Sequence, residues 1–114
     1  MADKIGHLEV VDILRKVAKG EVVPRLKYPK NSWEEVYAGS VIYLLGGFEI
    51  SIFNDCDSFD YIEYIMSVDG NRRGEFLDWF GAKDERGDEE NLQPDDILED
   101  EYFERMCSIF ASAA

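Results

Sequence analysis

Three aspartates, Asp55, Asp57 and Asp60, have the spacing that comes closest to a metal site in this chain. The D-x-D start matches an EF-hand loop, in which carboxylates at fixed positions hold calcium. The rest of that template fails, because Phe59 holds position five, Asp60 replaces the required glycine, and Met66 replaces the final glutamate. The sequence therefore predicts no metal ion and no other cofactor, but a turn in which aspartates bond backbone amides.

Cysteine and histidine could together supply a nucleophile and its general base. The chain has two cysteines, Cys56 and Cys107, and one histidine, His7. Carboxylates around Cys56 disfavour its thiolate, and Cys107 falls within a helical pattern where a thiol usually packs. Neither cysteine has a catalytic signature and no phosphate-binding loop is present, so we predict a non-enzymatic protein.

Carboxylates and aromatic rings are closely interleaved from Asp55 to Tyr64, and a second acidic stretch runs from Asp84 to Glu104. Rings anchor protein interfaces, and carboxylates pair with arginine and lysine. The candidate partner-binding residues are Asp55, Asp57, Asp60, Tyr61, Glu63, Asp84, Glu85, Asp88, Glu89 and Glu90. Both stretches also have a purely structural interpretation. The first would be a strand with its rings in the core, and the second would be a solvated loop followed by the outer face of a helix.

The acidic charge is concentrated in the last two thirds of the chain. Twenty-five Asp and Glu against twelve Lys and Arg give a net charge of -13; residues 1–35 sum to +1 and residues 36–114 to -14. Such a surface repels nucleic acid and anionic lipid, so we expect a basic protein as partner and no direct contact with nucleic acid or membrane. The chain starts without a secretory pattern and its longest apolar run is too short for a membrane span, which predicts a cytoplasmic protein.

The first third of the chain predicts one helix and a connector. Apolar residues at helical spacing predict an amphipathic helix over residues 7–19. Two prolines predict an irregular connector over residues 21–31. Ser32 with Glu35 matches a capping box, which predicts a single helical turn.

The middle of the chain predicts three strands. The Gly46-Gly47 pair between two strand-like runs predicts a two-residue hairpin. In that register Leu45 faces Phe48, Tyr43 faces Ile50, and Val41 faces Ile52, and these six share the core face. Residues 59–68 predict a third strand, which ends at a turn.

A helical pattern begins at Pro94 and continues to Ser112. The pattern does not decide whether this segment is one helix or two helices divided near Asp100. Residues 1–114 are therefore predicted to form a single acidic domain. The expected fold class is α+β, with an N-terminal helix, a three-stranded antiparallel β-meander, and a C-terminal helix or helices packed on one face.

Two motifs carry a resemblance to a known family. WEEVYAG at residues 33–39 and FNDCDSFDY at residues 53–61, followed by Asp69-Gly70 and Trp79, resemble a family of small uncharacterised bacterial or phage domains. The likeness spans most of residues 8–110, and it implies a compact α+β domain with no established activity. In size and acidity the chain is also similar in type to anti-CRISPR proteins and to immunity proteins that neutralise nuclease toxins.

These observations favour a non-enzymatic acidic inhibitor that binds the basic nucleic-acid-binding surface of a bacterial defence or nucleic-acid-handling protein, of the anti-CRISPR type. Duplex DNA carries a negative charge about every 1.7 Å, so an acidic ridge can compete for the same basic residues. The first alternative is an immunity protein that neutralises a bacterial nuclease toxin. The second is a small enzyme or metal-dependent domain of unknown chemistry.

Overall fold

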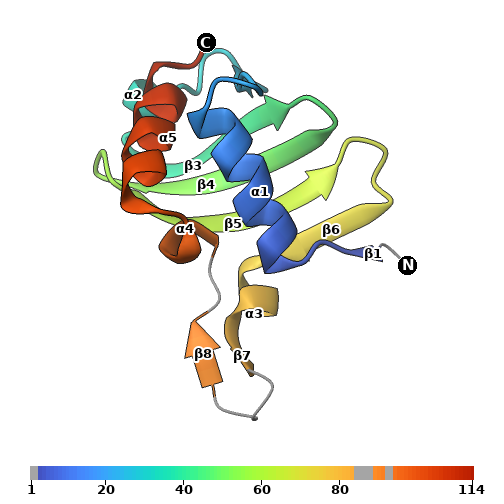
Figure 1. The fold of residues 1–114 in the computed structure, drawn as a ribbon. Coiled ribbons are helices and arrows are strands. Elements are labelled where there is room, and N and C mark those ends of the chain that lie inside the picture. Colours follow the sequence, from blue (N-terminus) through green and yellow to red (C-terminus); the bar gives the residue numbers. More distant parts are fainter. Residues whose placement is uncertain (1–2, 84–88, 92–93) are drawn as a thin grey trace.

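The computed structural model describes residues 3–83, 89–91 and 94–114. Six strands form one mixed sheet in the order β1-β6-β5-β4-β3-β2 (Figure 1). The strands are β1 (Asp3–Lys4), β2 (Arg25–Leu26), β3 (Ala38–Leu45), β4 (Phe48–Asp55), β5 (Phe59–Ser67) and β6 (Arg72–Glu75). β1 runs parallel to β6, and the other neighbouring pairs are antiparallel.

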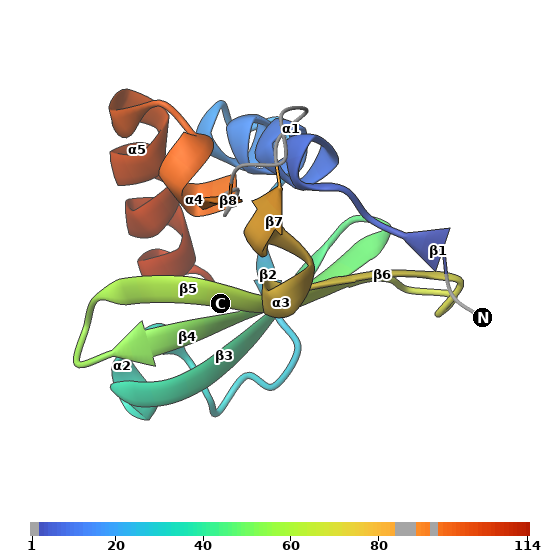
Figure 2. The same ribbon diagram turned by 90° about the horizontal axis from the view of Figure 1, so that it is seen from below.

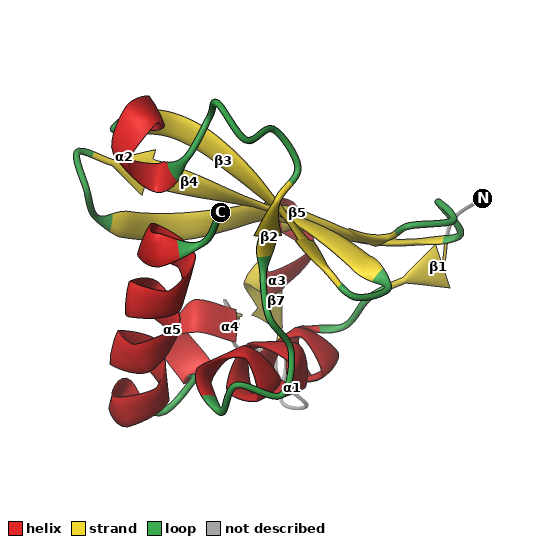
Figure 3. Cartoon of the chain, turned by 90° about the horizontal axis from the view of Figure 1, so that it is seen from above, coloured by secondary structure: helices red, strands yellow, loops and turns green. Residues whose placement is uncertain are grey.

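Two long helices, α1 (His7–Ala18) and α5 (Asp100–Ser112), lie over one face of this sheet, as Figures 2 and 3 show. The core forms between them and the inward residues of the three central strands, which include Val41, Tyr43, Leu45, Ile50, Ile52, Ile62 and Ile65. Tyr43 ties the layers together, since its ring lies 4.7 Å from that of Phe110 and its hydroxyl donates to the Phe110 carbonyl at 2.8 Å.

The other face of the central strands is turned away from α1 and α5, and we call it the open face. The remaining elements are short: α2 (Trp33–Val36), α3 (Phe76–Trp79), α4 (Pro94–Ile97), and the strands β7 (Phe80–Lys83) and β8 (Glu89–Asn91), which pair as a separate two-stranded sheet. The side chains of residues 80–83, 89–91 and 96 lie outside the description.

The predicted three-stranded meander is wrong, because the main sheet has six strands and is mixed. The three additional strands, β1, β2 and β6, are only two to four residues long and mostly polar. Strands of this length show no periodicity, and they form because a neighbouring strand offers hydrogen-bonding groups that local sequence does not reveal. β7 and β8 are likewise only four and three residues long.

The longer elements agree with their sequence patterns. α1 ends at Ala18, and Gly20 follows with a φ of 81°, the left-handed conformation that terminates helices. Ser32 caps α2 by accepting a hydrogen bond from the Glu35 amide at 3.3 Å. The C-terminal helical pattern is in two pieces, α4 and α5, with Leu98 and Glu99 between them.

The hairpin register is confirmed, since Leu45 pairs with Phe48 across the turn. Gly46 has a φ of 59°, whereas Gly47 is not in the left-handed region. Replacing Gly46 by alanine is therefore expected to lower the free energy of unfolding by about 1 kcal/mol. Gly47→Ala, which meets no atom within 4 Å, should leave stability unchanged or slightly raised. Urea denaturation of both variants checks this, and equal losses would contradict the observed turn.

Candidate protein-binding surface

A buried carboxylate lies at the centre of the open face. The Glu49 side chain is 7% exposed and receives two bonds, from Lys27 Nζ at 2.6 Å and from the Tyr64 hydroxyl at 2.7 Å. Burial works to raise the pKa of Glu49, but the bonds from Lys27 and Tyr64 outweigh it, so its pKa is below the usual value. Burial and the bond to Glu49 raise the pKa of Tyr64 to about 12.

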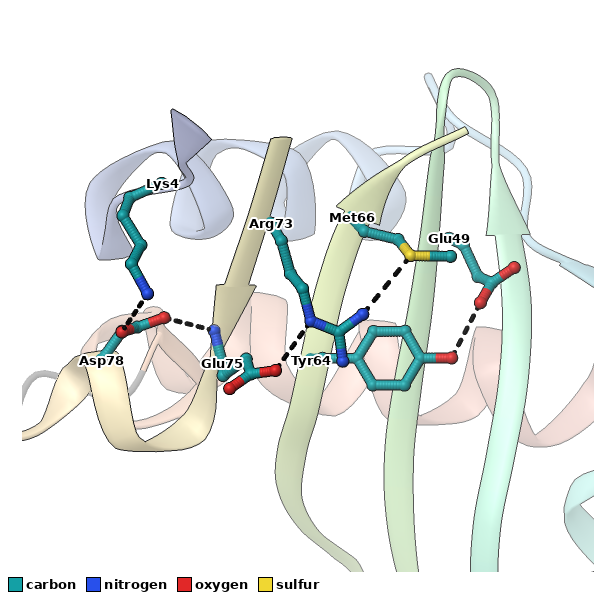
Figure 4. Close-up of polar contacts among 7 residues, drawn as sticks. All are labelled: Lys4, Glu49, Tyr64, Met66, Arg73, Glu75 and Asp78. Atoms are coloured by element: carbon teal, nitrogen blue, oxygen red, sulfur yellow. Dashed lines mark hydrogen bonds and ion pairs between the residues drawn. The ribbon is translucent and has the colours of Figure 1, made fainter. Parts of the chain in front are cut away.

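Arg73 extends this network toward the edge of the sheet (Figure 4). Its guanidinium lies 4.5 Å from the centre of the Tyr64 ring, and its Nε donates to Glu75 at 2.7 Å. The carboxylate of Glu49 therefore stays ionised near neutral pH and the hydroxyl of Tyr64 stays protonated. A group that exchanges protons in catalysis needs a pKa near the working pH. We therefore interpret the network as a structural tie that joins Lys27, the residue after β2, to β4, β5 and β6.

A row of three half-buried rings crosses the open face beside this network. Tyr61 stacks on Phe53 with ring centres 5.5 Å apart, and it contacts Phe76 at 4.8 Å. Glu63 also lies on this face, where it accepts a bond from the Ser51 hydroxyl at 2.8 Å. These rings offer an apolar surface next to polar groups, the combination typical of interface anchors.

The turn between β4 and β5 packs against α2 at one end of the sheet. Trp33 Nε1 donates to Asp57 Oδ1 at 2.9 Å, and the Asp57 amide donates to the Tyr37 carbonyl at 3.2 Å. The buried Asn54 side chain donates to the Trp33 carbonyl at 2.9 Å, which fixes α2 to the sheet. The five exposed acids that these contacts bring together, here called the acidic corner, are Glu34, Glu35, Asp55, Asp57 and Asp60.

The acidic corner has no internal counter-charge among the described residues. In the described part of the chain, seven of the twelve basic residues make ion pairs. All seven pairs involve acids outside the corner. The basic members of these pairs are Lys4, Arg15, Lys16, Lys27, Arg72, Arg73 and Arg105. Seven acids outside the corner therefore have a basic partner, whereas the five acids of the corner face solvent without one in the described part of the chain.

The backbone of the corner is strained. Tyr37, Cys56 and Asp57 have φ values of 57°, 49° and 71°, a region that non-glycine residues rarely adopt. Each such residue costs on the order of 1–3 kcal/mol, and strain of this kind persists where the surrounding contacts hold it. A hollow of about 470 Å³ lies here, lined by Trp33, Glu34, Tyr37, Asp57 and Ala111.

The predicted partner-binding residues fall into three groups. Asp55, Asp57 and Asp60 meet in the acidic corner, while Tyr61 and Glu63 lie on the open face. Asp84, Glu85 and Asp88 lie outside the described residues, and Glu89 and Glu90 belong to β8 with side chains outside the description. Glu34, Glu35, Trp33 and Tyr37 lie in the same corner but were not among the predicted residues, although the motif WEEVY places two acids between two aromatic residues.

The described residues contain no candidate metal centre, and both cysteines are free thiols. In that part of the chain, no group of three or more His, Cys, Asp or Glu side chains could hold a metal ion. Burial raises the pKa of the Cys107 thiol to about 11, which keeps it protonated, and Cys56 is an exposed free thiol in the strained turn. Among the described helices, none is long and apolar enough to cross a membrane.

The comparisons with known proteins give one family and no relative of known activity. The model of a domain of unknown function, DUF7693, matches residues 4–91. This match covers most of the chain, so the chain belongs to that family. No match was found among curated proteins or among solved structures. The expectation of a small domain from an uncharacterised family is confirmed, and its bacterial or phage origin stays a prediction.

Proposed function

We propose that this protein is a cytoplasmic, non-enzymatic inhibitor of the anti-CRISPR type, which presents its acidic corner to the basic nucleic-acid-binding surface of a bacterial defence or nucleic-acid-handling protein. The observation that carries the proposal is the convergence of five exposed carboxylates, from α2 and the β4–β5 turn, without a basic partner among the described residues. A surface that binds DNA or RNA has lysine and arginine at close spacing, and these are the groups that such carboxylates attract.

The neighbouring ring row supports the same proposal. Phe53 and Tyr61 are close in sequence to Asp55 and Asp60, at the same end of β4 and β5, so rings and acids can contact one partner together. Charges of this kind mainly raise the association rate and select the partner, whereas buried rings slow dissociation. An immunity protein would use the same surface against a nuclease toxin, and the identity of the captured target separates the two.

The test is capture of proteins from nuclease-treated lysate of the producing cells, by the wild type and by the double variant Asp55→Lys/Asp60→Lys. Both positions are exposed, so each substitution should change stability by less than about 0.5 kcal/mol. Retention of the captured protein should fall at least about tenfold, which corresponds to about 1.4 kcal/mol. Added duplex DNA should compete with the wild type for the captured protein.

The matched control is Asp3→Lys/Glu21→Lys, which changes the net charge equally at two exposed acids outside the corner. This control should retain the captured protein nearly as well as the wild type. Equal loss with both double variants would show that only net charge matters and would contradict the proposal. A captured protein that does not bind nucleic acid, or from which DNA does not displace the inhibitor, would also contradict it.

A further inference from the structure

We infer that the hollow in the acidic corner receives the guanidinium group of an arginine side chain from the protein partner. This inference deepens the proposed function, and it rests on that function in taking the ligand to be part of a basic protein.

The hollow combines two aromatic residues with two carboxylates. The lining residues are two aromatic ones, Trp33 and Tyr37, two acidic ones, Glu34 and Asp57, and Ala111 of α5. Its volume of about 470 Å³ is ample for one long side chain. Aromatic faces attract cations, and arginine is the cation most often found stacked on them.

The two carboxylates have free hydrogen-bonding capacity. Asp57 uses one oxygen to accept from Trp33 Nε1. Among the described residues, neither its second oxygen nor the carboxylate of Glu34 takes part in a hydrogen bond or an ion pair. A planar guanidinium has five N–H donors and can bond two carboxylate groups while its face lies on a ring.

The walls of the hollow are held in place before any ligand binds. Trp33 is 5% exposed, its indole is bonded to Asp57, and its carbonyl is bonded to Asn54. Tyr37 remains 57% exposed even though its backbone is held at a positive φ. A preorganised site loses less conformational entropy on binding, so an exposed ring on a constrained backbone suits a ligand-binding role.

The experiment is an NMR titration of the wild-type protein with a capped tetra-arginine peptide at about 0.15 M salt, where the Debye length is about 8 Å. We expect the indole Nε1–H signal of Trp33 and the amide signals of Glu34, Tyr37 and Asp57 to shift together with one dissociation constant. A capped tetra-citrulline peptide, which has the same shape without the charge, should not shift them. A tetra-lysine peptide should bind at least about fivefold more weakly.

The chain offers a matched control variant for an acidic and for an aromatic residue that line the hollow. Glu34→Gln should raise the dissociation constant for tetra-arginine at least about fivefold, and Glu35→Gln, an equal change of charge one residue away, less than about twofold. Tyr37→Ala should weaken binding by a similar factor to Glu34→Gln, whereas removal of another exposed ring by Tyr28→Ala should not. Equal effects of Glu34→Gln and Glu35→Gln, or equal binding of tetra-lysine, would overturn the inference.

The two proposals fail in distinguishable ways. Tetra-arginine binding at the hollow, with no nucleic-acid-binding protein captured from lysate, would retain the arginine site and reject the proposed target. Capture of such a target that depends on Asp55 and Asp60, with no localised response to tetra-arginine, would retain the function and reject the hollow.

Discussion

Replacing Gly74 by alanine is expected to lower the free energy of unfolding by about 2–3 kcal/mol, the upper part of the range for an overpacked core position. Gly74 lies on β6, where an added Cβ would come within 2.7 Å of both the Ile5 carbonyl oxygen and Trp79 Cζ2. Hydrogen bonds hold both Ile5 and Trp79 in place, so neither can move away easily from the added Cβ. Ile5 hydrogen-bonds to Arg73 through its amide, and the Trp79 indole donates to the Ile5 carbonyl at 3.2 Å.

Urea denaturation of Gly74→Ala measures this loss, and Gly47→Ala provides the baseline for a glycine-to-alanine change without a contact. In the absence of a clash, this change usually stabilises by about 0.4–1 kcal/mol through the unfolded chain. A Gly74→Ala variant as stable as Gly47→Ala would show that Ile5 and Trp79 do not pack against Gly74 at these distances. If Gly74→Ala loses stability but still binds its partner at low temperature, the substitution affects folding and not the binding surface.

Glu49→Gln is expected to lower the free energy of unfolding by about 2 kcal/mol at neutral pH, because it removes the charge from a buried, charge-assisted hydrogen-bond network. The amide still accepts from Tyr64, but Lys27 loses its counter-charge. Glu75→Gln is the matched control. Its pair with Arg73 is half exposed, so this substitution should cost under about 1 kcal/mol.

The loss caused by Glu49→Gln should depend on pH. The pKa of Glu49 is lower in the folded protein than its ordinary value of 4.5, so folding stabilises the ionised form. That stabilisation is complete above the unfolded value and disappears as the pH falls through the folded pKa. The stabilities of wild type and Glu49→Gln should therefore converge below that folded pKa. A difference that stays constant from pH 7 to pH 2 would show that the charge of Glu49 is not the cause.

The ion pairs explain how an excess of acid becomes localised. Arg15 reaches Glu99 at 2.6 Å, and Arg72 reaches Glu9 at 2.6 Å, so basic side chains join segments that are far apart in sequence. Lys4 similarly joins β1 to Asp78 of α3 at 2.9 Å. Exposed pairs of this kind contribute little stability individually. Their larger consequence is that these cations are held away from the acidic corner.

Elements with a strong local pattern could be predicted from the sequence. The apolar spacing over residues 7–19 specifies α1, and the Gly46-Gly47 pair specifies both the hairpin and its register, because turn length determines which residues face each other. The Asp55–Asp60 part of the corner was also predicted as a candidate site, since carboxylates in a turn remain exposed in most folds.

Other features depend on contacts between distant segments. β6 and β2 form along the free edges of β5 and β3, and β1 in turn pairs with β6. Glu49 lies on the face of β4 opposite the core residues, where Lys27 and Tyr64 bury it. The acidic corner is complete only when Trp33 bonds Asp57 across a separation of 24 residues and brings α2 to the β4–β5 turn. The sequence alone therefore determined the long local elements and the acidic character of the chain. The tertiary structure decided which acids lack a counter-charge, because ion pairing depends on distances that only folding sets.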